Sequence, residues 1–196
     1  MKICKTSKKM KNLILTLTFL GFTLISQSQN INVEKSIYEI QTGIFGIWFH
    51  NETRLSEEIA LRSEVGLDSG IFGGSYYDGV GFLMIPVITL EPRWYYNLNR
   101  RYSKSRNTSG NSGNFISLKT SYNPNWFIIS NYNNLTMVNQ ISIIPTWGIK
   151  RKIGRYFTYE TGTGIGYRYS FSNNKTFLKN KGVASLNLHL RIGYVF

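Results

Sequence analysis

Acid–base or metal chemistry in this chain would depend on two histidines, ten acidic side chains and one cysteine. His50 and His189 lie far apart in the sequence and Cys4 lies near its start, so none of them shows the spacing of a metal site. The glycine-rich residues 162–166 resemble a phosphate-binding loop, but no Lys-Ser/Thr pair and no helical pattern follow them. The sequence therefore predicts no metal site and no cofactor.

His189 is the candidate catalytic residue, because Arg191 lies two residues away and Glu160 falls on the preceding predicted strand. A histidine beside a carboxylate can activate a nucleophile. It can equally be a polar interior residue that its neighbours hold by hydrogen bonds. We favour the second interpretation, since no nucleophile motif of the G-x-S-x-G type is present. The chain is not predicted to be an enzyme.

The elements that position these residues are strands, because apolar and polar side chains alternate with a period of two. The pattern is clearest in residues 156–171 and 184–196. Shorter or weaker runs predict further strands at residues 38–48, 59–71, 88–97, 116–122 and 140–150. The 13 Tyr, 12 Phe and 18 Gly also favour an all-β protein, since aromatic residues favour strands and glycine favours tight turns.

One face of these strands carries polar side chains of both charges, which we predict to form a network inside a closed structure. Its members are Glu39, Arg62, Glu64, Asp68, Glu91, Arg93, Lys119, Lys150, Glu160, Arg168, His189 and Arg191. The same alternation would occur in a soluble sandwich with the apolar face as its core. Aromatic residues near the strand ends and strands of about 11 residues instead favour a membrane barrel, whose apolar face contacts lipid.

The predicted interior charges have two interpretations. A ring of acidic and basic side chains could select ions in a pore. Alternatively, an interior of about eight strands is just wide enough for side chains to fill, and the charges would form a plug of ion pairs. We favour the plug, in which removing Glu64 or Arg168 would lower stability because its partner would be left buried and unpaired.

Residues 1–28 have the features of a cleaved signal peptide. Five lysines precede an uncharged apolar run at residues 13–25, and Ser26-Gln27-Ser28 offers small residues to a signal peptidase. The run is too short to span a bilayer. Cleavage would leave residues 29–196 as one domain without cysteine and would lower the net charge from +13 to +8. A basic exported protein is expected to meet anionic lipid, lipopolysaccharide phosphate or an acidic polymer rather than nucleic acid.

The last strand carries the motif on which a family resemblance depends. Its alternating apolar residues end on an aromatic one: Leu188, Leu190, Ile192, Tyr194 and Phe196. This strand resembles the C-terminal signal by which the assembly machinery of bacterial outer membranes recognises its substrates. With the signal peptide, the chain resembles small outer-membrane β-barrel proteins, and its Tyr-, Asn- and Gly-rich composition is similar to those of Bacteroidota. The resemblance implies a closed antiparallel transmembrane β-barrel of eight strands, with both termini in the periplasm.

Seven strands follow from the alternation, whereas single-chain bacterial barrels have an even number. Residues 126–132 supply the eighth, because Asn123-Pro124-Asn125 predicts a turn before them. In this layout residues 98–113 and 172–182 form external loops, and residues 151–154 form a periplasmic turn. The loop cations would contact lipopolysaccharide phosphates or remain solvated: Arg100, Arg101, Lys104, Arg106, Lys175, Lys179 and Lys181.

Two features fit this layout poorly. The connection at residues 71–81 is longer than a periplasmic turn should be, and Pro86, Pro92 and Pro145 fall within predicted strands, where they predict bulges or misplaced strand ends. The predicted function is a structural, adhesive or surface-interaction role in the bacterial outer membrane. A narrow channel, a lipid A-modifying enzyme and an exported soluble β-barrel or sandwich that binds a ligand remain alternatives.

Overall fold

Nine strands dominate the computed structural model, which describes residues 31–73, 79–132, 135–171 and 181–196. The predicted signal peptide, residues 1–28, lies outside the described residues, as do Lys175 and Lys179. Ile31–Phe196 form one compact unit. The strands are β1 (Ser36–Gly43), β2 (Gly46–Arg54), β3 (Ile59–Phe72), β4 (Gly81–Trp94), β5 (Asn114–Asn123), β6 (Ile129–Ser130), β7 (Gln140–Ile153), β8 (Phe157–Ser170) and β9 (Lys181–Val195). Two short helices, α2 (Leu98–Tyr102) and η1 (Ser109–Asn111), connect β4 to β5.

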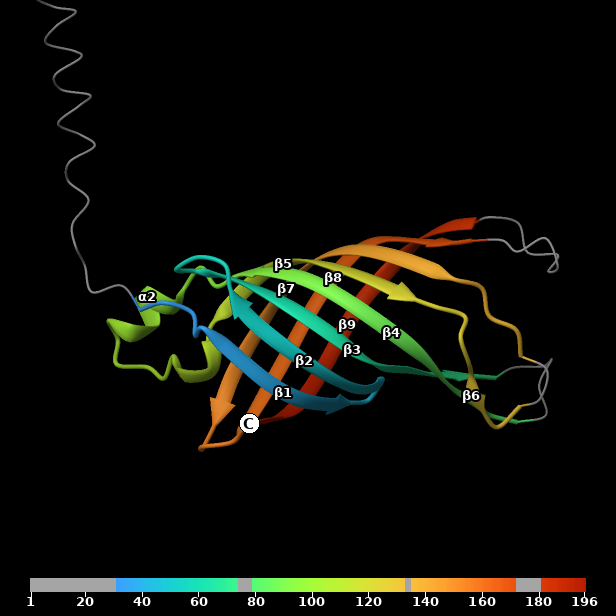
Figure 1. The fold of residues 1–196 in the computed structure, drawn as a ribbon, viewed down its shortest axis with the longest axis horizontal. Coiled ribbons are helices and arrows are strands. Elements are labelled where there is room, and N and C mark those ends of the chain that lie inside the picture. Colours follow the sequence, from blue (N-terminus) through green and yellow to red (C-terminus); the bar gives the residue numbers. More distant parts are fainter. Residues whose placement is uncertain (1–30, 74–78, 133–134, 172–180) are drawn as a thin grey trace, which may run out of the picture. The chain divides into compact units, whose positions relative to one another are not determined.

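Eight of these strands form a ring, in the order β3-β2-β1-β9-β8-β7-β5-β4, which closes because β4 also pairs with β3 (Figure 1). Every pairing is antiparallel. The first and last strands are neighbours, with Ile40 opposite Tyr194. The prediction of an all-β protein with eight antiparallel strands is confirmed at this level.

The first predicted strand, residues 38–48, is wrong. The chain turns at Ile44 and Phe45, where Gly43 pairs with Gly46, so that two strands replace one. Gly46 has a φ of 146°, which favours glycine. Isoleucine and phenylalanine are not turn-forming residues, so the alternation seemed to run on through the turn. Because the turn was missed, residues after it were assigned to the wrong face. Trp48, expected on the apolar face, is buried in the interior.

The predicted eighth strand at residues 126–132 is also wrong. Only Ile129–Ser130 form a strand there, β6, which pairs with Leu83 and Met84 beyond the end of β5. The prolines interrupt pairing without shifting its register. Neither Pro92 in the β4–β5 pairing nor Pro145 in the β7–β8 pairing has a partner, but the residues on both sides of each keep the same alignment. The bulges predicted there are therefore absent from these two described pairings.

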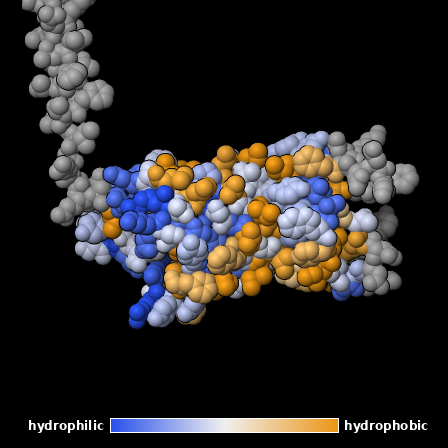
Figure 2. Space-filling view, in the orientation of Figure 1, coloured by the Kyte–Doolittle hydropathy of each residue, from blue (hydrophilic) through white to orange (hydrophobic). Residues whose placement is uncertain are grey.

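The polar face of the strands points into the ring and the apolar face points outward. The ionisable residues that are buried inside are Glu39, His50, Glu52, Arg62, Glu64, Glu91, Arg93, Lys150, Glu160, His189 and Arg191. Each strand of the ring exposes large apolar side chains, among them Tyr38, Phe49, Val65, Leu90, Leu118, Ile143, Ile165 and Leu188. Figure 2 shows such residues along the strands on the face drawn, whereas hydrophilic residues gather at the end that carries α2. Within the described part of the chain, no helix is long and apolar enough to cross a membrane.

The two ends of the ring differ from the predicted layout. Residues 98–113 connect β4 to β5 at the same end as the β7–β8 turn and the C-terminus (Figure 1). The prediction that residues 98–113 and 151–154 lie at opposite ends is therefore wrong, because both lie at the same end of the ring. The missed hairpin at Ile44 and Phe45 explains the error for residues 98–113, since one omitted strand reverses the end to which the next connections belong. The extra strand predicted at residues 126–132 restored the correct end for residues 151–154. The missed hairpin also explains the long connection after β3, which lies at the opposite end.

Candidate functional site

Two arginines and a glutamate form the centre of the charged interior. Glu160 on β8 accepts a hydrogen bond from Arg62 Nη1 (2.9 Å), and β3 and β8 lie on opposite sides of the ring. Arg93 on β4 contacts both oxygens of the same carboxylate, at 2.8 and 2.9 Å. All three side chains are 0–1% exposed. These ion pairs therefore cross the interior rather than follow its wall.

A second group of contacts lies beside the first and joins other strands across the ring. Lys150 Nζ on β7 lies 2.9 Å from Glu39 Oε2 on β1 and 3.2 Å from Glu52 Oε1 on β2. His50 Nε2 lies 3.4 Å from Glu39 Oε2. Arg93 Nη1 lies 3.2 Å from the same Glu52 oxygen, so Glu52 links the two groups. The interior at this level is filled by side chains of opposite charge.

A third contact lies on the side of the β1–β2 turn. Together the three groups of contacts form an ion-pair layer, which consists of Glu39, Glu52, Glu64, Glu160, Arg62, Arg93, Arg191 and Lys150. Arg191 Nη1 on β9 donates a hydrogen bond to Glu64 Oε2 on β3 (2.6 Å). The Arg191 guanidinium lies 3.7 Å above the ring of Trp48, a cation–π contact. His189 Nε2 lies 3.3 Å from Glu160 Oε1, and its Nδ1 lies 3.3 Å from the amide nitrogen of Asn187. His189 is thus held by polar neighbours inside the ring.

The structure brings most of the predicted interior residues together. Buried within the ring are Glu39, Arg62, Glu64, Glu91, Arg93, Lys150, Glu160, His189 and Arg191. Asp68 and Lys119 are half-buried nearer the β1–β2 turn, and Arg168 is exposed. The expected loss of stability on removing Arg168 therefore has no buried ion pair to support it among the described residues.

Sequence reasoning missed His50 and Glu52 as members of the interior network. Both follow Trp48 at alternate positions of β2. Because the hairpin was missed, the inward direction of their side chains could not be recognised. The pair of glycines that flanks a two-residue turn, Gly43 and Gly46, is the signal that would have found them.

The segment with α2 and η1 closes one end of the ring. Its Tyr95 and Leu98 pack with Val33, Ala60 and Phe115 in a small buried core. Tyr95 donates a hydrogen bond to Glu52 Oε2 (3.1 Å), and Asn111 Nδ2 donates another to the same oxygen (3.0 Å). Burial, reinforced by the negative charge of Glu52, raises the pKa of the Tyr95 phenol, which stays protonated and keeps donating. Glu52 therefore ties this segment to the ion-pair layer.

Replacing Tyr95 by phenylalanine should lower the free energy of unfolding by about 1.5–3 kcal/mol, because a buried hydrogen bond to a charged group is lost. Urea unfolding would measure the change. Tyr102→Phe is the control, since Tyr102 is 51% exposed and its hydroxyl has no hydrogen-bond partner in the described part of the chain. Equal stability of the two variants would contradict the anchoring role of Tyr95.

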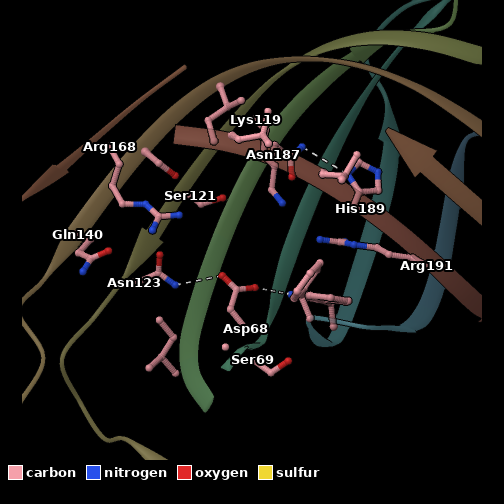
Figure 3. Close-up of a pocket in the computed structure, with 18 of the residues that line it drawn as sticks. Asp68, Ser69, Lys119, Ser121, Asn123, Gln140, Arg168, Asn187, His189 and Arg191 are labelled. Carbon is pink, nitrogen blue, oxygen red and sulfur yellow. Dashed lines mark hydrogen bonds between the residues drawn. The ribbon is translucent and has the colours of Figure 1, made fainter. Parts of the chain in front are cut away.

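The other half of the interior contains a cavity of about 530 Å³ between the ion-pair layer and the β1–β2 turn. Figure 3 shows the Arg168 and Arg191 side chains reaching into it from opposite sides of the view, with Asp68 between them. Asp68 accepts hydrogen bonds from Trp48 Nε1 (2.9 Å) and from Asn123 Nδ2 (3.3 Å). Lys119, Gln140 and Ser142 also line the cavity.

Comparison with known proteins finds no matching family model, no matching curated protein and no matching solved structure. Among the residues that the structure describes, no group of His, Cys, Asp and Glu side chains is arranged to hold a metal ion.

The remaining predicted residues lie on the outer face and at the two ends. Leu188, Leu190, Ile192, Tyr194 and Phe196 are all exposed on the outward face at β9 and its end. Arg100, Arg101, Lys104 and Arg106 lie on or just after α2, at the end of the ring that carries the C-terminus. Lys181 begins β9 at the other end. Of the seven predicted loop cations, the five that the structure describes therefore lie at both ends of the ring, and Lys175 and Lys179 lie outside the described residues.

Proposed function

We propose that the chain is a β-barrel of the bacterial outer membrane, with a structural, adhesive or surface-interaction role and a blocked interior. The observation that carries the proposal is the inverted distribution of side chains. Buried ionisable residues face the inside, and large apolar residues such as Leu188 (62% exposed) face the outside. Soluble monomers rarely expose a continuous apolar surface of this kind, whereas lipid favours it.

Strand length and aromatic residues agree with this proposal. Strands of 14 residues such as β3 are about 45 Å long, which exceeds the roughly 25 Å apolar band of such barrels even when tilted. Aromatic side chains cluster near both ends of the ring. Tyr156 stacks on Tyr194 near the C-terminal end, and Tyr169 contacts Phe171 at the other. Such girdles are typical of residues at the membrane surface.

The ion-pair layer supports a structural role over a channel. Arg62, Arg93 and Glu160 meet across the interior, so these buried ion pairs would obstruct a solute on that path. The proposal assigns no catalysis to the chain, since the contacts of His189 with Glu160 and Asn187 explain its position.

The proposed partners are membrane lipid and the assembly machinery. The outward row of β9 that ends at Phe196 would be the assembly signal. With the termini in the periplasm, Arg100 and Arg101 would contact lipid phosphates of the inner leaflet, and Lys181 would be on the lipopolysaccharide side.

Expression in a Gram-negative host followed by fractionation tests the membrane proposal. The protein should be recovered in the outer membrane, and unboiled samples should migrate differently from boiled ones because a closed barrel resists unfolding in detergent. Recovery in the soluble periplasmic fraction, with one mobility, would overturn the proposal.

Planar bilayer recordings test the blocked interior. The wild-type protein should give no steady conductance at 100 mV, because the ion-pair layer fills the interior. A matched reconstitution of a known porin is the positive control. Reproducible ohmic steps from the wild-type protein would assign a channel function instead.

A further inference from the structure

We propose that the cavity between the ion-pair layer and the β1–β2 turn binds a small, diffusible, hydroxylated anion of the sugar phosphate class. The cavity lies inside the ring, with lining residues from β3, β4, β5, β7, β8 and β9. Its volume of about 530 Å³ is within the range of small-molecule sites, roughly 300–1,000 Å³. This inference goes beyond the proposed structural role and does not depend on the membrane.

The charge of the lining carries the first step of the inference. Three cations line the cavity, Lys119, Arg168 and Arg191, against the single carboxylate of Asp68. Arg191 is paired with Glu64, and the Asp68 oxygens already accept hydrogen bonds. The side chains of Lys119 and Arg168 form no hydrogen bond or ion pair with any part of the chain that the structure describes. Two cations are therefore left for an anion.

The positions of these cations carry the second step. Ser121 on β5 lies opposite Ser142 on β7, and Ser142 lies opposite Arg168 on β8. Side chains at directly opposed positions of antiparallel strands are about 5 Å apart. Lys119 is two residues from Ser121 and therefore shares its inward face. Arg168 and Lys119 thus flank a pair of serine hydroxyls on one continuous wall, and both long side chains can converge on one phosphate.

Neutral polar groups carry the third step, the choice of a hydroxylated ligand. Within the described ranges, the side-chain amide of Gln140 and the hydroxyl of Ser142 make no hydrogen bond, although Ser142 is buried. Asn187 Nδ2 donates to Thr146 Oγ1 (3.1 Å), which leaves its carbonyl oxygen as an acceptor. A sugar would supply donors and acceptors to these groups, and the phosphate would contact the cations.

Glucose 6-phosphate is the probe, with glucose and inorganic phosphate as partial probes, in isothermal titration of the detergent-solubilised full chain. Glucose 6-phosphate should bind more tightly than either partial probe, and more weakly at high ionic strength. Lys119→Gln and Arg168→Gln should each weaken binding about tenfold or more, since each removes a charge-assisted contact. Lys181→Gln is the matched control, because Lys181 lies at the same end but does not line the cavity.

Unchanged affinity in both Lys119→Gln and Arg168→Gln, or no binding of any probe to the wild-type protein, would overturn the inference. Equal affinity for inorganic phosphate would overturn the sugar part of it. Arg168 is exposed and unpaired among the described residues, so its variant should fold, and gel mobility would verify this. A protein that binds the probe but is recovered in a soluble fraction would keep this inference and overturn the membrane proposal.

Discussion

Replacing Glu160 by alanine is expected to lower the free energy of unfolding by about 3–5 kcal/mol, because it leaves two buried guanidinium groups without their shared carboxylate. Glu160 is 0% exposed and contacts Arg62 and Arg93 at 2.8–2.9 Å. The remaining carboxylates near Arg93, those of Glu52 and Glu91, offset only part of the loss. The midpoint of urea unfolding, monitored by gel mobility, would measure the effect.

Two further variants make this result interpretable. Glu160→Gln keeps the size of the side chain and an oxygen that can accept from Arg93, so it should cost less than the alanine variant. Glu57→Ala removes a carboxylate from an exposed position and should change stability by less than about 1 kcal/mol. If Glu160→Ala and Glu57→Ala unfolded at the same urea concentration, the ion-pair layer would not stabilise the fold.

Replacing Leu188 by lysine should lower the free energy of unfolding by about 2–4 kcal/mol in a bilayer, since a charge near the middle of the lipid-facing surface is poorly solvated. Leu188 lies near the middle of β9 and is 62% exposed. In water the same change would be close to neutral, because an exposed leucine has no packing to lose. Unfolding from lipid vesicles, compared with the wild type, would measure the change.

Leu55→Lys is the matched control for this prediction. Leu55 is 60% exposed, nearly the same as Leu188, but it lies between β2 and β3 at the end of the ring. The two substitutions are alike in chemistry and exposure and differ only in their place along the proposed barrel. Equal effects of both would contradict a membrane around the middle of the strands.

The long alternating runs made much of the fold predictable. Residues 156–171 and 184–196 correspond closely to β8 and β9, because their period of two has no interruption that a turn could hide. The turn at Ile44 and Phe45 could not be seen, since neither residue has a turn preference. Residues 126–132 could not be excluded by pattern alone, as a short β-prone run forms a strand only where a neighbour is free to pair.

The sequence indicates which residues face the interior, but not which of these residues contact one another. Alternation indicates that Arg62 and Glu160 point inward, yet they are 98 residues apart, and their meeting depends on how far each strand is shifted around the ring. For the same reason the cavity could not be predicted from the sequence. Lys119 and Arg168 belong to the same predicted set as Arg62, but they lie beyond the level at which the ion pairs fill the interior.

The pairing of β1 with β9 has a consequence for folding kinetics. This seam extends only over Glu39–Gly43 on β1, whereas β8 and β9 pair along Phe157–Ser170. Forming it closes a loop that contains most of the chain, which costs more conformational entropy than any hairpin and gives a high contact order. Closure of the seam is therefore expected to limit the folding rate, and a chain still without β9 would expose strand edges on which copies could aggregate.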